Sequence, residues 1–106
     1  MKILEKDIVK MCLDYLTLKK IFHYRQNTGG FKTERGSFVR FGFKGSPDIV
    51  VVINGKYIGL ECKVPNGKQS DGQIKFEQEL KSAGGDYHII TNYEDLKKLI
   101  EGYGGN

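Results

Sequence analysis

Cysteine is scarce in this sequence, which has 106 residues and only two cysteines, Cys12 and Cys62. The two lie far apart and form no CxxC pair, so neither a disulfide framework nor a zinc site is indicated. Both are predicted to be small buried hydrophobic residues in a reducing compartment. We therefore expect a cytoplasmic protein.

Long apolar runs are also missing. No segment approaches membrane-spanning length, and the amino-terminal stretch MKILEKDIVKMCLDYL interleaves charges with apolar residues, unlike the continuous apolar core of a signal peptide. Internal repeats, helix-turn-helix patterns and zinc-finger patterns are absent as well. The remaining composition, 39% hydrophobic and 28% charged, predicts one globular domain over residues 1–106, with no membrane association and no small-molecule cofactor.

The stretch DIVVVINGKYIGLECK, residues 48–63, predicts a β-hairpin. Asn-Gly between apolar, β-branched runs is a strong hairpin signal, because a type I′ turn needs positive φ at both central residues. If Asn54 and Gly55 form a two-residue loop, Ile53 faces Lys56 and every residue further out has a defined partner.

Counted outward, this register makes Asp48 face Glu61 in a non-hydrogen-bonded pair, with Cβ atoms about 4.5–5.5 Å apart. Lys63 shares their face and Cys62 points to the other. Two facing carboxylates repel, and a hard divalent cation such as Mg²⁺ relieves the repulsion. Two alternatives remain: Asp48 is a turn residue after Pro47 with Lys63 neutralising Glu61, or a three-residue loop places Asp48 opposite Cys62.

Positive charge is concentrated between residues 19 and 44, where seven basic residues accompany one acid, Glu34. Phenylalanines are interleaved with them, which is typical of a polyanion-binding surface. The alternative is a solvated face over core phenylalanines. The basic residues are Lys19, Lys20, Arg25, Lys32, Arg35, Arg40 and Lys44.

The order of predicted elements is helix, strand, strand, hairpin, helix, strand, helix, which is αβββαβα when the hairpin is counted as one β unit. This order predicts an α/β domain with a mixed central sheet flanked by helices. A glycine pair, Gly29-Gly30, is expected to break the chain between the first two strands. The expected ranges are 3–22, 22–28, 37–43, 48–63, 70–83, 87–91 and a last helix capped by Asn92.

Two polar residues of the predicted helices have competing interpretations. Glu5 lies within the apolar stripe of the first helix, where an acid is costly unless it binds a cation, but it also favours the helix dipole in the first turn. Gln73 follows Ser70 by three residues, which is the pattern of a capping box, yet it lies on the Phe76–Leu80 face that should pack towards the sheet.

Taken together, GSPD at residues 45–48 and ECK at 61–63 resemble the PD…(D/E)xK pattern of the PD-(D/E)xK nuclease superfamily, whose restriction-endonuclease-like core is αβββαβ. The finer resemblance is to the VRR-Nuc branch, through Arg25-Gln26-Asn27, GSPDIVV, ECK and DGQIKF. The resemblance spans about residues 5–91.

This resemblance implies a role for each matching residue. Asp48, Glu61 and the backbone carbonyl of Cys62 would bind Mg²⁺, for which Mn²⁺ should substitute. Lys63 would be the catalytic lysine, Gln73 the helix glutamine of the branch, and Glu5 the first-helix acid of Holliday-junction-resolvase-like members.

The resemblance also implies a substrate. Phosphates of branched DNA are expected to contact the basic segment, and a resolvase needs a homodimer for two symmetric incisions. The candidate dimer surface is the aromatic stretch from Phe31 to Phe43, unless it packs internally. Alternatives are a flap or nicking nuclease and a DNA-binding nuclease subunit that acts with a helicase or restriction-type partner. The expected DNA-contacting residues are Arg25, Asn27, Lys32, Arg35, Arg40, Lys44 and Lys68.

Overall fold

A computed structural model describes residues 2–26, 29–41 and 44–104, with the side chains of 29–31 and 39–41 excluded. Three helices and six strands are present in these ranges. No helix among them is long and apolar enough to cross a membrane. The elements are α1 (Glu5–Leu18), β1 (His23–Arg25), β2 (Gly29–Lys32), β3 (Phe38–Phe41), β4 (Ile49–Ile53), β5 (Lys56–Cys62), α2 (Asp71–Ser82), β6 (Asp86–Ile90) and α3 (Tyr93–Gly102).

Four strands form the central sheet in the order β1-β4-β5-β6. β1 and β4 pair antiparallel, as do β4 and β5, whereas β6 runs parallel to β5, so the sheet is mixed. The β4–β5 turn has two residues, with Asn54 at φ 51° and Gly55 at φ 80°, and Ile53 faces Lys56. The predicted hairpin register is therefore confirmed.

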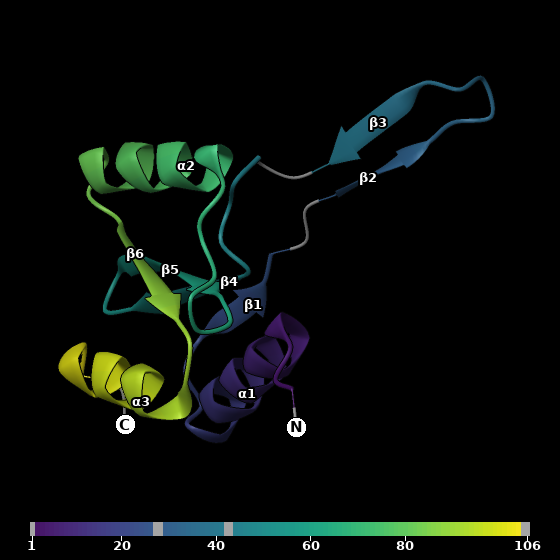
Figure 1. Ribbon diagram of the computed structural model, residues 1–106. Helices are drawn as coiled ribbons and strands as arrows, with labels where there is room; N and C mark the ends of the chain where they lie inside the picture. Colours follow the sequence, from purple (N-terminus) through teal and green to yellow (C-terminus); the bar gives the residue numbers. More distant parts are fainter. Residues whose placement is uncertain (1, 27–28, 42–43, 105–106) are drawn as a thin grey trace.

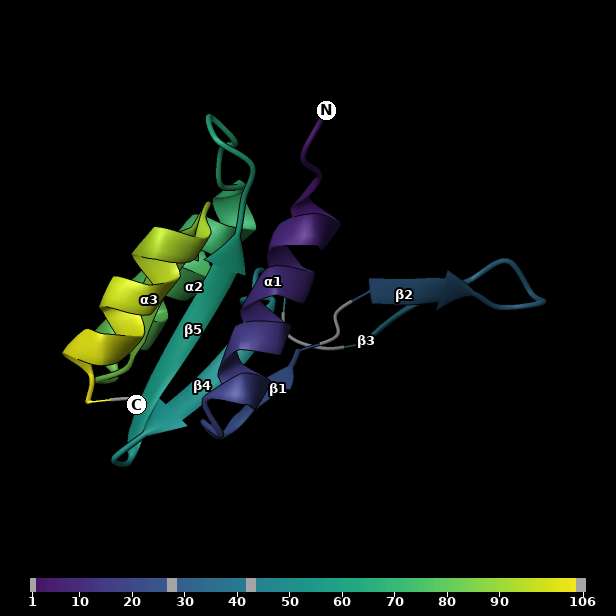
Figure 2. The ribbon, with the colours of Figure 1, turned by 90° about the horizontal axis from the view of Figure 1, so that it is seen from below.

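The sheet lies between two helical layers (Figure 1). One face packs against α1 and α3, and the core between them contains fully buried side chains such as Cys12, Leu16, Leu60 and Leu96. On the other face α2 lies over β5 and β6, where the rings of Phe76 and Tyr87 are 6.4 Å apart. The view from below shows α1 and α3 on the same side of the sheet (Figure 2).

Helix α1 is shorter than the sequence predicts. It starts at Glu5, because the Asp7 carboxylate accepts a hydrogen bond from the Leu4 N–H at 2.9 Å. It ends at Leu18, since Lys20 adopts a left-handed backbone with φ 57° and the Ile21 N–H donates to Leu16 O across the helix end. The last residues of the predicted range, up to Phe22, therefore lead into β1 instead.

The second predicted strand, residues 37–43, is not part of the central sheet. Its described part is β3, which pairs antiparallel with β2 in a separate two-stranded sheet that projects away from the body (Figures 1 and 2). We call residues 29–41 the arm. The expected break at Gly29-Gly30 is wrong, because these glycines pair with Phe41 and Arg40 as the start of β2. Without the arm, the order α1, β1, β4, β5, α2, β6, α3 matches the predicted αβββαβ core.

Gly59 of β5 packs closely against Pro47, the residue before Asp48. A Cβ atom added there would lie 2.7 Å from Cγ of Pro47 and 3.6 Å from the ring of Tyr87. Proline is a rigid ring that cannot move aside without moving the backbone next to Asp48. Glycine at this position therefore lets β4 and its preceding turn pack closely on β5.

We predict that Gly59→Ala lowers the free energy of unfolding by about 1–3 kcal/mol, as expected for overpacking. Urea unfolding monitored by circular dichroism measures the change. Gly102→Ala is the matched control, because a Cβ there meets nothing within 4 Å. Equal stability of the two variants would contradict the packing of Pro47 against Gly59.

Candidate metal centre

Asp48 lies at the point where the β4–β5 ladder stops. The last paired residues are Ile49 and Leu60, and beyond them the Asp48 carboxylate accepts a hydrogen bond from the Cys62 N–H at 2.8 Å. The Asp48 carbonyl accepts another from the Gln26 N–H, also at 2.8 Å. These two bonds fix Asp48 between β5 and the end of β1.

Glu61 belongs to the buried part of β5 and is only 2% exposed. Its Oε2 accepts a hydrogen bond from Nε2 of Gln73 at 2.7 Å and lies 3.7 Å from Nζ of Lys63. Its Oε1 is buried with no hydrogen-bond partner among the described residues. One oxygen of this carboxylate is thus held by the protein and the other is left for a ligand.

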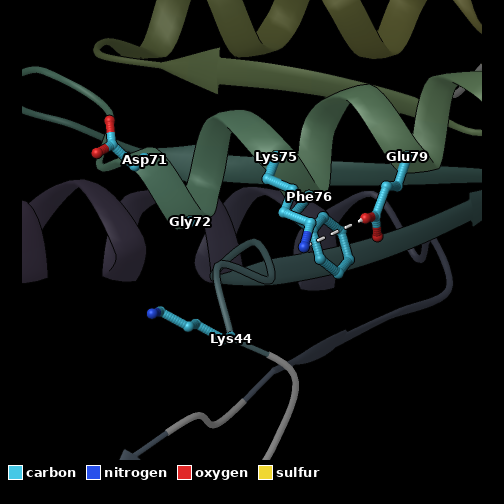
Figure 3. A pocket seen from close by; sticks show the side chains of 6 residues that line it. All are labelled: Lys44, Asp71, Gly72, Lys75, Phe76 and Glu79. Carbon is cyan, nitrogen blue, oxygen red and sulfur yellow. Dashed lines mark ion pairs between the residues drawn. The ribbon is translucent and has the colours of Figure 1, made fainter.

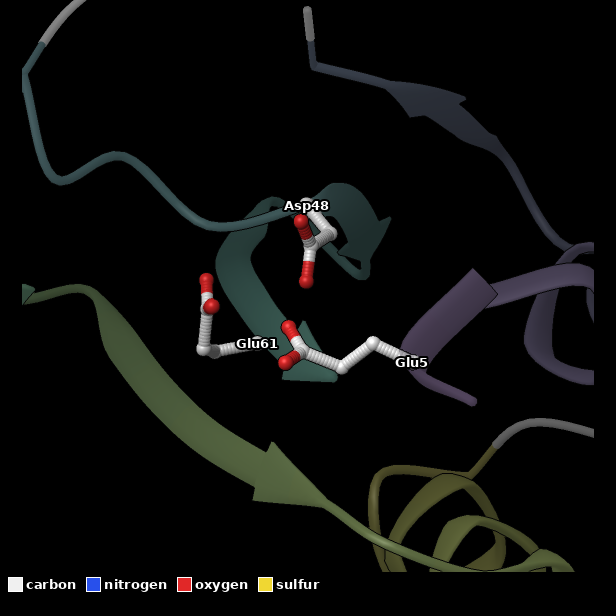
Figure 4. Close-up of side chains that lie close together, drawn as sticks. All are labelled: Glu5, Asp48 and Glu61. Carbon is white, nitrogen blue, oxygen red and sulfur yellow. The ribbon is translucent and has the colours of Figure 1, made fainter. Parts of the chain in front are cut away.

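Glu5 completes an acidic cluster. It is the first residue of α1, and one carboxylate oxygen from each of Glu5, Asp48 and Glu61 lies within 4.8 Å of the others (Figure 4). The three come from a helix, a turn before a strand, and a neighbouring strand. The structure therefore brings Glu5 to the facing pair that the hairpin register predicts.

Gln73 satisfies both interpretations made from the sequence. Its Oε1 accepts a hydrogen bond from the Ser70 N–H at 2.8 Å, and the Ser70 hydroxyl accepts one from the Gln73 N–H at 3.2 Å, which is a capping box. Because the Ser70 N–H must meet an oxygen, the amide orientation is fixed and the NH₂ group points to Glu61. The cap of α2 thereby holds the carboxylate of the site.

Lys63 and Cys62 lie on opposite faces of the strand end, as predicted. The Lys63 side chain is mostly buried beside Glu61, with 11% of it exposed, while the Cys62 side chain is fully buried, 3.9 Å from Sγ of Cys12. Counted outward from the turn, the next hydrogen-bonded rung would join Cys62 to Pro47. Proline has no N–H, so Pro47 cannot donate a hydrogen bond to the Cys62 carbonyl oxygen.

The electrostatics of the cluster appear in the pKa of Glu61. This pKa is raised from 4.5 to about 7, first by burial and then by the neighbouring Asp48, while Lys63 opposes the rise. Glu5 adds to the same effect. Such a raised pKa is typical of carboxylates in functional sites.

These residues fit a hard divalent cation. Three carboxylates offer oxygen ligands, and no donor in the described part of the chain satisfies the buried Oε1 of Glu61. Mg²⁺ and Mn²⁺ prefer such oxygen donors. A cation would also remove the repulsion between Asp48 and Glu61 that raises the pKa of Glu61.

The residues predicted to contact DNA are spread over several elements, unlike the three acids of the cluster. Arg25 is exposed on β1 and Lys68 on the loop after β5, whereas Lys32 and Arg35 are exposed on the arm. Lys44 is exposed beside the first turn of α2. Asn27 and the Arg40 side chain lie outside the described part of the chain.

In the aromatic stretch from Phe31 to Phe43, Phe38 is the one phenylalanine whose side chain the structure describes, and it lies outside the core. Phe38, the first residue of β3, is 61% exposed. The other three phenylalanine side chains of the stretch fall outside the described set. Phe38 is therefore not buried in the hydrophobic core.

Tyr87 is a neighbour of the site that the sequence analysis missed. It is 3% exposed on β6 beneath α2, and its pKa is raised first by burial and then by Glu61. Its strand partner is Gly59. A tyrosine in an apolar strand gives no local signal, and only the parallel pairing of β6 with β5 reveals its position.

Comparison with known proteins identifies the fold. No family model and no curated protein matches the sequence. A solved structure described as a "VRR_NUC domain" matches with a TM-score of 0.66 and 20% sequence identity, over 93% of this chain and 96% of that chain. The chain has the VRR_NUC fold. The fold part of the resemblance seen in the sequence is thereby confirmed.

We predict that the metal-free protein loses stability as pH rises. Because the pKa of Glu61 is raised, the folded state holds a proton that the unfolded state has released, so the free energy of unfolding falls as pH rises from 4.5 to about 7. A shift of this size corresponds to at most about 3 kcal/mol. Chemical unfolding at a series of pH values in chelator measures the loss.

Glu61→Gln should remove this part of the pH dependence, whereas the exposed control Glu79→Gln should not. Saturating Mn²⁺ should offset the loss in the unaltered protein. A pH profile that is the same for Glu61→Gln and the unaltered protein would contradict the raised pKa.

Proposed function

We propose that this protein is a divalent-metal-dependent endonuclease that hydrolyses phosphodiester bonds in DNA. The observation that carries the proposal is the cluster of Glu5, Asp48 and Glu61 beside Lys63, with one buried Glu61 oxygen that has no hydrogen-bond partner among the residues the structure describes. The VRR_NUC fold supports it, because the name of the matching domain designates a nuclease.

Glu5, Asp48 and Glu61 would hold the cation, with the Cys62 carbonyl as a further ligand. When bound, Mg²⁺ or Mn²⁺ would lower the pKa of a bound water and neutralise charge on the phosphoryl oxygens. Gln73 keeps the Glu61 carboxylate oriented, and Lys63 would orient or deprotonate the attacking water or stabilise the developing negative charge.

A four-way DNA junction is the substrate we propose within this activity. Resolving a junction needs two symmetric incisions, and the described residues of one chain contain a single acidic cluster of this kind. A homodimer related by a twofold axis would present two such clusters. The fold has no separate sequence-reading module among its described elements, which favours recognition of DNA shape over sequence.

Purified protein should cut DNA in Mg²⁺ or Mn²⁺ and not in chelator. Asp48→Ala and Glu61→Ala should each lower the rate by more than about a hundredfold, since even loss of a residue that only supports a metal ligand costs about 10–100-fold. DNA binding in chelator should persist or tighten as negative charge is removed. Glu94→Ala, an exposed acid on α3, is the control.

Duplex, flap and four-way junction substrates should be compared in the same assay, with sedimentation equilibrium at the working concentration. A monomer that cuts flaps but not junctions would refute the resolvase proposal and leave the nuclease proposal intact. A Glu61→Ala protein that cuts at the normal rate would refute the site itself.

We predict that Lys63→Ala slows turnover by about 10²–10⁴-fold, the usual contribution of a general acid or base. Mg²⁺ affinity should stay unchanged or improve slightly, because an ammonium group repels the cation. Single-turnover kinetics and calorimetry separate the two effects. Lys63→Arg keeps the charge but cannot act as a base, so activity retained in that variant indicates charge stabilisation. Loss of metal binding in Lys63→Ala would instead assign the lysine a structural role.

A further inference from the structure

We infer that the arm is a clamp for duplex DNA, which grips the duplex on one side of the bond to be cut. This inference rests on the proposed nuclease function, since it places the duplex at the metal centre. It adds the element that holds the substrate, and four features of the arm support it.

First, the described residues that precede and follow the arm, Gln26 and Gly45, are held beside the metal centre. On the β1 side, the Gln26 N–H donates to the carbonyl of Asp48, which is itself a member of the acidic cluster. On the β3 side, Gly45 packs so closely on α2 that an added Cβ would overlap the Gly72 carbonyl oxygen. Gly72 immediately precedes Gln73, the residue that holds Glu61.

The contact at α2 also involves Lys44. Its side chain passes over Gly72 at a pocket on the first turns of α2 (Figure 3). The other basic residue of this pocket, Lys75, is paired with Glu79 at 3.9 Å. Lys44 has no such ion pair among the described residues, and its ammonium group is available to a phosphate at the base of the arm.

Second, the arm stands apart from the body. Its two strands hydrogen-bond only to each other in the described sheets, and the radius of gyration, 14.8 Å, exceeds the value of about 13 Å expected for a compact chain of this length. An isolated two-stranded hairpin is marginally stable in water, so a partner surface is needed to hold it.

Third, the dimensions of the arm suit a DNA groove. From Gly29 to Lys32 strand β2 spans about 10 Å at about 3.4 Å per residue, and the turn at residues 33–37 extends beyond it. The paired part of the arm thus corresponds to about three base-pair steps, and the major groove admits a two-stranded ribbon. The tip is a formed turn, because Thr33 Oγ1 accepts a hydrogen bond from the Ser37 N–H and Thr33 O accepts one from the Gly36 N–H.

Fourth, the arm carries charge that phosphates complement. Lys32 and Arg35 are exposed, and no acidic side chain in the described part of the chain pairs with either. By contrast, lysines on α1 and α2 such as Lys10 and Lys81 form ion pairs with acids one turn away. The free cations of the arm thus lie on the element that leaves the body beside the metal centre.

The test compares Lys32→Ala/Arg35→Ala with the control Lys97→Ala/Lys98→Ala, which removes the same charge from exposed positions of α3. Fluorescence anisotropy in chelator measures binding of labelled duplexes of increasing length at several salt concentrations. The arm variant should lower the slope of log affinity against log salt by about 1.8, since each phosphate contact contributes about 0.9. The control should leave the slope unchanged.

The unaltered protein should gain affinity as the duplex is extended through at least about three base pairs beyond the cut site, and the arm variant should lose that gain. Equal slopes for the arm and control variants would overturn the clamp. So would an arm variant that dissociates a dimer in sedimentation velocity without changing the slope, because the arm would then bind a second copy of the chain.

Thermal unfolding verifies that both variants fold. Cleavage by the same preparations in Mn²⁺ separates the two proposals. A protein that binds with the predicted slopes but cuts nothing keeps the clamp and refutes the nuclease. A protein that cuts DNA, but whose salt slope is unchanged in the arm variant, keeps the nuclease and refutes the clamp.

Discussion

The register of one β-hairpin determines the rest of the site. With Asn54 and Gly55 both at positive φ, the β4–β5 turn contains two residues and fixes which side chains face each other along both strands. A slip of one residue would exchange the two faces of a strand, taking Glu61 into the helical core and Cys62 out of it. The core prevents such a slip, because Cys62, Leu60 and Ile58 are all fully buried on that face. Hydrophobic packing on one side of the sheet thus positions the carboxylates on the other.

That position is unfavourable for the protein alone. Glu61 is buried next to Asp48, and its raised pKa measures the free energy that the ionised form loses through burial and repulsion. The protein compensates partly, with a hydrogen bond from Gln73 and the ammonium group of Lys63, but leaves Oε1 without a donor. An apolar residue at this position would give a more stable domain, so the buried acid is better explained by ligand binding than by folding.

The parts of the structure that the sequence predicts well have local causes. The Asn54-Gly55 turn, the Ser70 and Asn92 caps and the apolar strands each depend on residues within a few positions, and all are found. The arm was missed for the opposite reason. Two adjacent glycines usually interrupt a strand, and pairing of Gly29 with Phe41 depends on residues twelve positions away.

The site shows the same division. Asp48 and Glu61 follow from counting along one hairpin, whereas Glu5 reaches them only because α1 packs across the sheet. Sequence alone gave the capping box and the site contact of Gln73 as competing alternatives. They are compatible, since an amide has separate donor and acceptor ends and the helix cap uses only the acceptor.

The distribution of charge links the fold to the chemistry of a polyanion. Three carboxylates converge at one point, and without a cation their field opposes any approaching phosphate. The net charge of the chain is nevertheless +4, and exposed basic residues such as Lys32, Arg35 and Lys44 lie on or beside the arm. Attraction for a polyanion therefore comes from residues outside the acidic cluster, and repulsion is confined to the cluster itself. Such an arrangement allows a phosphate backbone to bind the surface generally but to occupy the cluster only when a cation is there.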